Sequence, residues 1–397
     1  MSEPTVTPRS ARPASQVLYW PVLLTMLAFG LLSFMLPIYA RELQANALEI
    51  GGLFSAFSIT ALLVRPLVGW GLDRFGRKRF LMAALIGYGA ALAVMALAES
   101  LAALYAARMI QGLASSLMWV TTYTIAADLS PQGERGRSAA LVDSAVSQGM
   151  LFGSIPGWTA FMLLPVALAW PLIFGVYALA AMGAAALAWR SVPETCPTAA
   201  APAEAKPAAL HPWLYRLMAI VFFTGMTSAL VAPIWLVYLQ DHFTQDIQMI
   251  VWAYLPSALV YSFLPARLGP LSDRFGRAPL MTLGLVVSGV VSLALPVLTR
   301  LPNGLWILAA LWAAEAVGFV MASPAQEALV ADLVGSNQRG RGYGMYNFAS
   351  GLGAVIGPLA GGYLYDHANQ AAPFYLNGVV LLLCAGLVIV LLRKKVG

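Results

Sequence analysis

The sequence predicts an all-α membrane protein with twelve transmembrane helices arranged in two halves of six. Of its 397 residues, 60% are hydrophobic and only 10% are charged, and the mean hydropathy is +0.77. A soluble protein of this length would carry about 100 charged residues, whereas this chain has 23 basic and 17 acidic ones. The composition therefore excludes an ordinary soluble globular protein. The 35 glycines and 25 prolines agree with membrane helices, in which both residues are common.

Twelve apolar segments are each long enough for one helix, because a spanning helix takes about 20 apolar residues. The first six segments lie near 17–39, 48–71, 80–98, 102–127, 138–160 and 164–189. The second six lie near 213–239, 248–270, 279–299, 303–330, 341–365 and 372–392. They define an N-terminal half at 17–189 and a C-terminal half at 213–392.

Polar segments flank these halves and indicate their orientation. Residues 1–16 are rich in Ser, Thr and Pro, which is typical of a disordered tail, residues 190–212 form a linker with five prolines, and residues 393–397 form a short tail. Of the 23 basic residues, 18 lie in the tails and in the loops after even-numbered segments, whereas only Arg41 and Arg300 lie on the other side. The positive-inside rule then predicts a plasma (inner) membrane protein with both termini in the cytoplasm.

The charge and the cysteine content also limit the partners. The net charge of +6 is explained by this topology and by contact with the lipid bilayer, so no nucleic-acid partner is expected. Two cysteines and three scattered histidines make neither a disulfide framework nor a metal site. We therefore expect no metal and no cofactor.

The two halves repeat each other. Three pairs of motifs match at offsets of 200, 204 and 204 residues: GWGLDRFGR (69–77) with GPLSDRFGR (269–277), AADLSPQGERGR (126–137) with VADLVGSNQRGR (330–341), and GMLFGSIPG (149–157) with GAVIGPLAG (353–361). Three collinear matches indicate an internal duplication. In membrane proteins, internal repeats are typical of secondary transporters whose substrate site lies between the repeats.

These motifs resemble the signatures of the major facilitator superfamily, over nearly the whole chain. The loop motif, its second copy, and the Arg108-x-x-Gln111-Gly sequence of the fourth segment carry the resemblance. The glycine signature of the eleventh segment is complete, with Gly353, Gly357, Pro358, Gly361 and Gly362. Within the superfamily the chain is most similar to the twelve-helix, proton-coupled drug and metabolite exporters. The fifth segment departs from their pattern: it has Gly149, Gly153 and Pro156, with the proline displaced by two positions.

The resemblance implies that the repeated loop motif is a conformational latch. Asp73 would lie at the N-terminal end of the eleventh helix, where a carboxylate is stabilised by about 0.3–2 kcal/mol. Arg77 would pair with Asp128, and Gly69 would let the second helix approach its neighbour closely. The second copy of the latch comprises Gly269, Asp273, Arg277 and Asp332. The alternative is that these charges only fix topology and loop solubility.

Arg108 is a candidate for the substrate or proton pathway. It lies in an apolar part of the fourth segment, where an arginine costs about 2.5–3.5 kcal/mol on insertion scales. At helical spacing, Arg108, Gln111, Ser115, Trp119 and Thr122 form one polar and aromatic stripe, which we expect to face a central cavity. In the alternative, the arginine extends to the outer interface.

Glu315 is the sharpest single prediction. It stands in the middle of LAALWAAEAVGFVMA, which has no other charge, and at the offset of 204 it corresponds to Gln111. Removal from water disfavours the charged form of a carboxyl, so this residue suits a proton carrier. The alternatives are a fixed ion pair with Arg108 and a protonated acid bonded to the backbone.

Three other positions complete the predicted pathway. Asp143 and Asn347 occupy equivalent places in the fifth and eleventh segments and would form a polar pair near the cytoplasmic mouth, unless Asp143 is a simple interfacial acid. Trp312, with neighbouring aromatic residues, would stack on a substrate, whereas membrane aromatics also face lipid.

The leading functional interpretation is a monomeric secondary transporter that works by alternating access. The chain has no GxxxxGK[ST] motif, so an ion gradient is the expected energy source, and the isolated Glu315 favours the proton. The apolar and aromatic stripe favours efflux of an amphipathic or lipophilic organic solute. The alternatives are an uptake symporter for a sugar or another small metabolite, and a lipid or lysolipid flippase. A membrane enzyme or sensor is least favoured, because no catalytic cluster is recognisable.

Overall fold

The computed structural model describes residues 14–130, 135–195, 212–264, 275–333 and 339–393, and every regular element in these ranges is a helix. Most of the expected tails and linker, and the loop positions Gly269 and Asp273, lie outside the described residues. The chain folds into two compact units. Unit 1 comprises Met1–Tyr39 and Thr60–Ala203, and unit 2 comprises Ala40–Ile59 and Glu204–Gly397.

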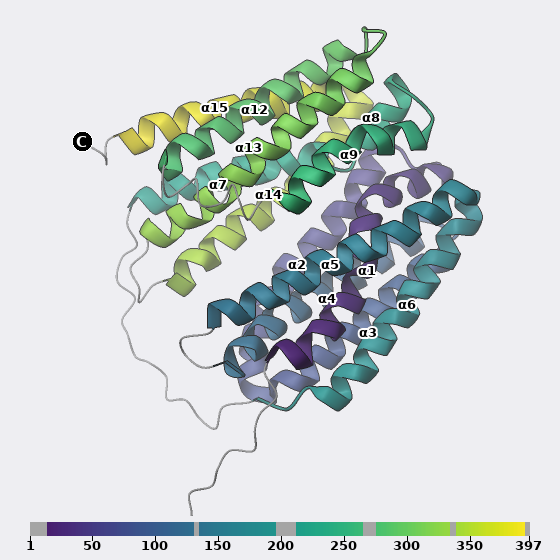
Figure 1. Cartoon of the computed structure of the whole chain (residues 1–397), viewed down its shortest axis with the longest axis vertical. Helices are drawn as coiled ribbons and strands as arrows, with labels where there is room; N and C mark the ends of the chain where they lie inside the picture. The colour runs from purple at the N-terminus through teal and green to yellow at the C-terminus, as the bar shows by residue number, and fades with distance from the viewer. Residues whose placement is uncertain (1–13, 131–134, 196–211, 265–274, 334–338, 394–397) are drawn as a thin grey trace, which may run out of the picture. The chain divides into compact units, whose positions relative to one another are not determined.

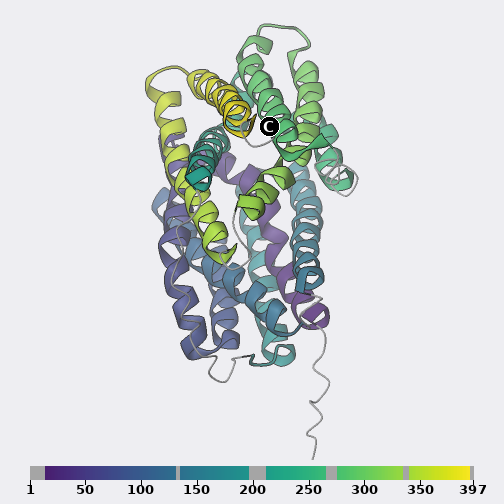
Figure 2. The same ribbon diagram turned by 90° about the vertical axis from the view of Figure 1, so that its left-hand side faces the viewer.

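Unit 1 is a bundle of long helices that run alongside one another (Figures 1 and 2). Its helices are α1 (Ala14–Glu42), α2 (Ala47–Phe75), α3 (Arg77–Ala96), α4 (Leu101–Asp128), α5 (Arg135–Leu163) and α6 (Val166–Ser191), and the end of α1 and the first half of α2 belong to unit 2. Trp170 of α6 is fully buried, stacks on Tyr39 at 4.0 Å between ring centroids, and donates from Nε1 to the Met95 carbonyl at 2.7 Å. The stacking on Tyr39 of α1 and the hydrogen bond to α3 hold both helices against α6.

Unit 2 contains the remaining helices. They are α7 (Pro212–Val231), α8 (Trp235–His242), α9 (Ile247–Phe263), α12 (Arg277–Leu298), α13 (Gly304–Leu333), α14 (Arg339–His367) and α15 (Ala372–Arg393). The segment expected as one helix at 213–239 is interrupted after Val231 and resumes at Trp235. Pro233 lies in this break, and proline both lacks a backbone N–H and clashes with the preceding turn. A single apolar span, Leu214–His242, still covers α7 and α8 together.

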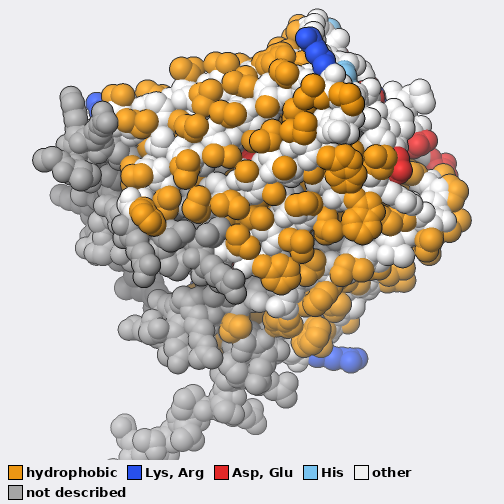
Figure 3. All heavy atoms as spheres, turned by 45° about the horizontal axis from the view of Figure 1, so that its top comes forward, with side chains coloured by type: hydrophobic (Ala, Val, Ile, Leu, Met, Phe, Trp, Pro, Cys, Tyr) orange, Lys and Arg blue, Asp and Glu red, His pale blue; other side chains and the backbone are white. Residues whose placement is uncertain are grey.

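Eight of the described helical segments are long and apolar enough to cross a membrane by length and composition alone. Those outside this set are α4, α5, α9 and α14. Several polar residues, among them Arg108, Asp143 and Asn347, lie in α4, α5 and α14 and lower the hydropathy of these helices, and α9 is described over only 17 residues. Figure 3 shows hydrophobic side chains covering the visible face, with charged side chains at its margins, as expected for a surface in lipid.

The glycine signatures lie at equivalent helix crossings in the two units. A Cβ added to Gly149 of α5 would lie 2.5 Å from the Leu23 carbonyl oxygen of α1, and one added to Gly353 of α14 would lie 2.5 Å from the Met226 nitrogen of α7. The same close approach recurs one and two turns later, at Gly153, Gly157, Gly357 and Gly361. Small residues thus let α5 pack on α1 and α14 pack on α7.

The proline positions of the two signatures differ. Pro156 is exposed, whereas Pro358 is buried, and its carbonyl lies where a Cβ on Gly51 of α2 would be. The displaced proline of the fifth segment therefore lies on an open face of α5.

Both copies of the loop motif begin the next helix in the same way. Gly76 precedes α3 with φ of 88°, and Gly276 precedes α12 with φ of 85°. Side chains with a Cβ rarely adopt this backbone conformation, so glycine is required at both positions. The duplicated RFGR sequence therefore encodes a helix start that is equivalent in the two units.

Candidate functional site

Unit 2 contains a partly open cavity of about 380 Å³. Polar side chains from six helices reach its wall: Thr224 and Ser228 of α7, Tyr261 of α9, Ser288 of α12, Glu315 and Gln326 of α13, Tyr346 and Ser350 of α14, and Asn377 of α15. The described lining contains no lysine, arginine or histidine. The cavity can therefore hold water or a small organic group with hydrogen-bonding atoms.

Glu315 provides the carboxyl group of this cavity. On α13, the cavity is lined by Glu315, Phe319, Ala322 and Gln326, which share one face because they are spaced by three or four residues. The Glu315 carboxyl hydrogen-bonds the Ser288 side chain of α12. The residue is thus an acid that touches both a polar partner and open space within its own unit.

Asn377 contributes a second polar group to the cavity. Its Nδ2 atom donates to Ser292 Oγ at 3.0 Å, and Ser292 Oγ donates to the Phe374 carbonyl at 2.9 Å. The Oδ1 atom of Asn377 is buried and has no hydrogen-bond partner among the described residues. A buried amide oxygen costs free energy when it is unsatisfied, so this atom is an available acceptor for water or a ligand.

The aromatic residues near Trp312 pack on one another. Trp312 of α13 lies 5.4 Å from Trp235 of α8 in an edge-to-face arrangement and 6.3 Å from Tyr254 of α9, between ring centroids. Trp235 and Tyr254 are 5.9 Å apart. These distances match favourable aromatic pairs, so the cluster has a packing role in unit 2. Stacking of Trp312 on a substrate remains a prediction.

Arg108 lies in the interior of unit 1. It is 5% exposed, its Nη1 atom donates to Gln111 Oε1 at 2.6 Å, and the buried Tyr88 of α3 lies within electrostatic range. Gln111, Ser115 and Thr122 are also buried, and Trp119 is the partly exposed member of the stripe. The polar members of the stripe are thus packed within unit 1, and a position of the stripe beside a central cavity stays a prediction.

Asp143 finds a partner within its own unit. Its carboxylate accepts a hydrogen bond from Tyr123 of α4. Ser147, which lies one turn further along α5, donates to the backbone carbonyl of Asp143. Asn347 is exposed on α14 in unit 2. A pairing of Asp143 with Asn347 stays a prediction, as does the ion pair of Arg108 with Glu315.

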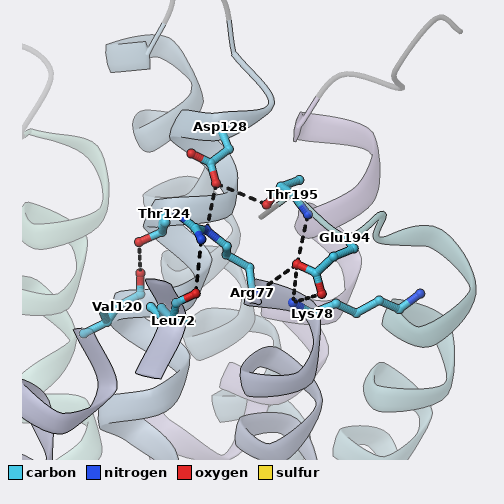
Figure 4. A network of polar contacts seen from close by, with 8 residues as sticks. All are labelled: Leu72, Arg77, Lys78, Val120, Thr124, Asp128, Glu194 and Thr195. Carbon is cyan, nitrogen blue, oxygen red and sulfur yellow. Dashed lines mark hydrogen bonds and ion pairs between the residues drawn. The ribbon is translucent and has the colours of Figure 1, made fainter. Parts of the chain in front are cut away.

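The first copy of the latch motif forms a polar network at one end of unit 1 (Figure 4). Arg77 Nε lies 3.1 Å from Asp128 Oδ2, so the ion pair implied by the resemblance is present. Arg77 Nη1 also donates to the Leu72 carbonyl at 3.1 Å. The guanidinium group thereby connects α2, α3 and α4. Whether this network controls transport remains a prediction.

Two residues of this network were missed by the sequence analysis. Thr195 Oγ1 donates to Asp128 Oδ2 at 3.2 Å, and the Glu194 carboxylate accepts from the backbone N–H groups of Arg77 at 2.7 Å and Lys78 at 3.3 Å (Figure 4). Glu194 thus satisfies the first N–H groups of α3, where a negative charge is favoured. The available signal was an acidic residue directly after α6 and opposite the basic start of α3, in a segment that we assigned to the linker.

Other latch positions give less information. The side chains of Asp73 and Asp332 lie outside the described part of the structure, and Arg277 begins α12 as Arg77 begins α3. A Cβ added to Gly69 would meet nothing within 4 Å. A close helix approach at Gly69 therefore stays a prediction.

A second polar cluster lies in unit 2 and includes Arg41, near the end of α1. Arg41 forms a two-pronged ion pair with Asp241, at 2.8 and 3.0 Å, and Tyr365 donates to the same carboxylate at 2.8 Å. Asp366 accepts from the Ala47 and Leu48 N–H groups and so caps α2. The sequence analysis missed this cluster, although Arg41 and Asp241 are opposite charges at an offset of 200.

The described residues contain no group of three His, Cys, Asp or Glu side chains that could hold a metal ion.

Comparison with known proteins agrees with this architecture. The chain is 24% identical over 388 residues to multidrug resistance protein 2 of Bacillus subtilis (strain 168), covering 94% of each chain. It is 25% identical over 394 residues to the quinolone resistance protein NorA of Staphylococcus aureus (strain MSSA476), covering 96% of each chain. The fold matches a bacterial homologue of the human lysosomal transporter Spinster, with a TM-score of 0.74, 15% identity, and coverage of 96% of this chain and 97% of that chain.

The family comparison matches the chain twice. The model of the Major Facilitator Superfamily matches residues 21–219 and again residues 217–397, so each match covers one six-helix half. The two matches agree with the duplication seen in the motifs and in the glycine crossings. This protein is a membrane transporter that belongs to the Major Facilitator Superfamily.

Proposed function

We propose that this transporter exports an amphipathic or lipophilic organic solute in exchange for protons, with Glu315 as the proton acceptor. The observation that carries the proposal is the position of Glu315. Its carboxyl is hydrogen-bonded to Ser288 and lies at the wall of a cavity whose described lining contains no basic residue. Such an acid is free to bind and release a proton without breaking an ion pair in its cavity.

The physical argument rests on the cost of moving charge through a dehydrated state. A carboxylate without a cation beside it costs several kcal/mol in apolar surroundings, whereas the protonated acid keeps only the modest cost of a polar group with a hydrogen bond. Proton binding therefore lowers the barrier for the conformational change that carries the empty transporter back. Binding of substrate would favour proton release, which is the coupling that antiport requires.

The direction of transport is supported by the relatives. The two named above are called multidrug resistance and quinolone resistance proteins. The lining of the cavity also contains apolar side chains such as Phe319, Leu285 and Val231, which suit an amphipathic solute. We further propose that the protein works as a monomer in the plasma (inner) membrane, with both termini in the cytoplasm, as the distribution of basic residues predicts.

The test is proton movement in proteoliposomes that contain a pH-sensitive dye and no imposed gradient. Candidate solutes, beginning with lipophilic organic cations and quinolones, are added outside. Antiport makes the lumen alkaline because protons leave the lumen in exchange for each solute molecule that enters. Symport makes the lumen acidic because protons enter together with the solute. A lumen that stays neutral while labelled solute enters would indicate uncoupled transport or lipid translocation and would refute the proposal.

The matched variants are Glu315→Gln, Glu315→Asp and Glu99→Gln. Glu315→Gln mimics the neutral acid and should abolish proton movement while solute binding is retained, and Glu315→Asp should keep part of the flux. Glu99 is exposed and far along the chain from the cavity residues, so Glu99→Gln should behave as the wild type. Full proton-coupled flux in Glu315→Gln would remove Glu315 from the mechanism.

A further inference from the structure

One end of unit 1 exposes large aromatic side chains among basic residues. Trp70 is 61% exposed, Phe75 is 50% exposed, and Trp189 is 64% exposed. Arg74, which follows Trp70 by one helical turn, is exposed as well. We call Trp70, Arg74, Phe75, Lys78 and Trp189 the aromatic–basic cluster. Exposed tryptophan and arginine together are typical of the boundary between lipid and water.

The face of α2 that leads to this cluster is apolar and exposed. Leu63 and Leu67 are both 66% exposed and share a helix face with Trp70 and Arg74, at spacings of three and four residues. In a transmembrane helix such a row contacts acyl chains. The row therefore leads from hydrocarbon at the leucines to the interface at Trp70 and then to a cation at Arg74.

Arg74 is held by ring faces. Its guanidinium carbon lies 5.5 Å from the Trp70 ring centroid and 5.6 Å from that of Phe75, and the two rings are nearly perpendicular at 6.0 Å. A cation–π contact orients the guanidinium group and uses none of its five N–H donors. The guanidinium group of Arg74 thus lies beside both rings, and its N–H donors are available to an anion.

Lys78 is held in a similar way by α6. Its Nζ atom lies 5.1 Å from the Trp189 ring centroid and donates to the Trp189 carbonyl at 2.7 Å. An ammonium group has three N–H donors, so two remain. The backbone N–H groups of Arg77 and Lys78 are already bonded to Glu194. An anion at this end would therefore be bound by side chains and not by the start of α3.

The repeat shows that part of this cluster is not needed for the loop fold. At the offset of 200, Pro270, Ala278 and Pro279 replace Trp70, Lys78 and Arg79, while the Asp-Arg-Phe-Gly-Arg sequence is kept. Gly76 and Gly276 nevertheless have nearly the same φ. Arg74 and Phe75 are thus kept in both copies, whereas Trp70 and Lys78 occur in the first copy only, which indicates that these two residues have a task separate from the loop fold.

We propose that the aromatic–basic cluster binds the phosphodiester headgroup of an anionic phospholipid such as phosphatidylglycerol. Arg74 and Lys78 bind the phosphate oxygens, Trp70, Phe75 and Trp189 lie at the level of the glycerol backbone, and the acyl chains lie along Leu63 and Leu67. A soluble phosphate would use only the two cations. The apolar row of α2 therefore selects the lipid.

The experiment uses the purified full chain in a neutral detergent. Dioleoyl-phosphatidylglycerol, dioleoyl-phosphatidylcholine or inorganic phosphate is titrated, and bound lipid is counted by native mass spectrometry alongside the thermal unfolding midpoint. We expect phosphatidylglycerol alone to bind tightly and to raise the midpoint. Each cation removed, in Arg74→Gln or Lys78→Gln, should weaken binding about fivefold, which is about 1 kcal/mol per basic residue near a lipid surface.

The control is Arg300→Gln, which removes an exposed arginine from unit 2 and should leave lipid binding unchanged. If a glutamine variant does not fold, the wild type still decides: binding of phosphatidylglycerol should weaken several-fold as salt is raised, because the phosphate contact is electrostatic. Equal affinity for phosphatidylcholine, salt-insensitive binding, an equal effect of inorganic phosphate, or equal losses in Arg74→Gln and Arg300→Gln would each overturn the proposal.

Discussion

The two units place different chemistry at equivalent positions of the repeat. Gln111 of α4 corresponds to Glu315 of α13 at the offset of 204, and Tyr88 of α3 corresponds to Ser288 of α12 at the offset of 200. In unit 1 the position is filled by the buried Tyr88 and by Arg108, which bonds Gln111. In unit 2 the smaller Ser288 bonds Glu315 beside a cavity of about 380 Å³.

This difference shows that equivalent positions are packed in unit 1 and lie beside a cavity in unit 2. A serine in place of a tyrosine lacks the aromatic ring, so volume between the two helices becomes available to water or a ligand. The position of Arg108 is occupied in unit 2 by Trp312, which packs on Trp235 and Tyr254. We infer that the polar residues of α4 stabilise unit 1, whereas the acid of α13 serves transport.

The largest expected effect tests what the two units share. Gly153→Ala and Gly357→Ala should each destabilise the protein by about 3 kcal/mol, at the upper end of the range for overpacking. In both cases the added methyl group would overlap a backbone carbonyl of the facing helix, Leu27 of α1 or Met226 of α7. Thermal unfolding in detergent measures the loss.

The control for this pair is Gly69→Ala, because a Cβ there meets nothing within 4 Å. It should keep or slightly raise stability, since alanine favours a helix over glycine by about 1 kcal/mol. Strong destabilisation by Gly69→Ala, or a mild effect at only one of the two crossings, would contradict the equivalence of the packing.

The next effect tests how the units differ. Arg108→Ala should lower the free energy of unfolding by about 2 kcal/mol, because Gln111 Oε1 would lose its hydrogen bond inside a buried cluster. Glu315→Gln should change stability by less than about 1 kcal/mol, because a neutral amide can keep the bond to Ser288 and the cavity can supply water. Unfolding midpoints and transport rates of both variants should be compared. If Arg108→Ala is stable but inactive, Arg108 belongs to the pathway and not to the core.

Much of this fold was accessible from the sequence, because helices in a bilayer must be long, apolar and internally hydrogen-bonded. The positions of the helices, the duplication, and the glycine crossings at Gly149 and Gly353 follow from such patterns. The interruption at Pro233 was missed, because an apolar run of sufficient length hides a local break. Helical spacing indicates which residues share a face with Arg108 but not which neighbour that face contacts, so the contact of Arg108 with Tyr88 was not accessible from the sequence.

The candidate site was only partly predictable. Glu315 stood out because it is a lone charge in an apolar segment. Ser288 and Asn377 carry no such signal, since a single serine or asparagine is common in membrane helices, and their role depends on where the helices bring them. Glu194 was hidden by the composition of the linker around it. Contacts between distant segments thus account for most of what the sequence did not provide.

A smaller effect is expected at the ion pair of unit 1. Arg77 is 5% exposed and Asp128 is 27% exposed at the side chain, so the pair is partly shielded from water. A double-mutant cycle with Arg77→Gln and Asp128→Asn should give a coupling free energy of about 1 kcal/mol, between the values for exposed and buried pairs. Thr195→Val removes only the neighbouring hydroxyl and should cost less. A coupling of zero would reduce the network to a topological role.

The smallest effect is expected at the ion pair of unit 2, and it sharpens the comparison with the pair just discussed. Arg41 and Asp241 have ideal two-pronged geometry, but their side chains are 38% and 20% exposed, and Tyr365 keeps a hydrogen bond to Asp241 when Arg41 is removed. Arg41→Gln should therefore lower the free energy of unfolding by only about 0.5 kcal/mol. The loss should disappear at about 1 M salt, where the screening length falls to about 3 Å, whereas the coupling at Arg77 should persist because that guanidinium is buried. A salt-independent loss in Arg41→Gln would show that the Arg41–Asp241 pair is as well shielded as the Arg77–Asp128 pair, and the distinction between the two pairs would then fail.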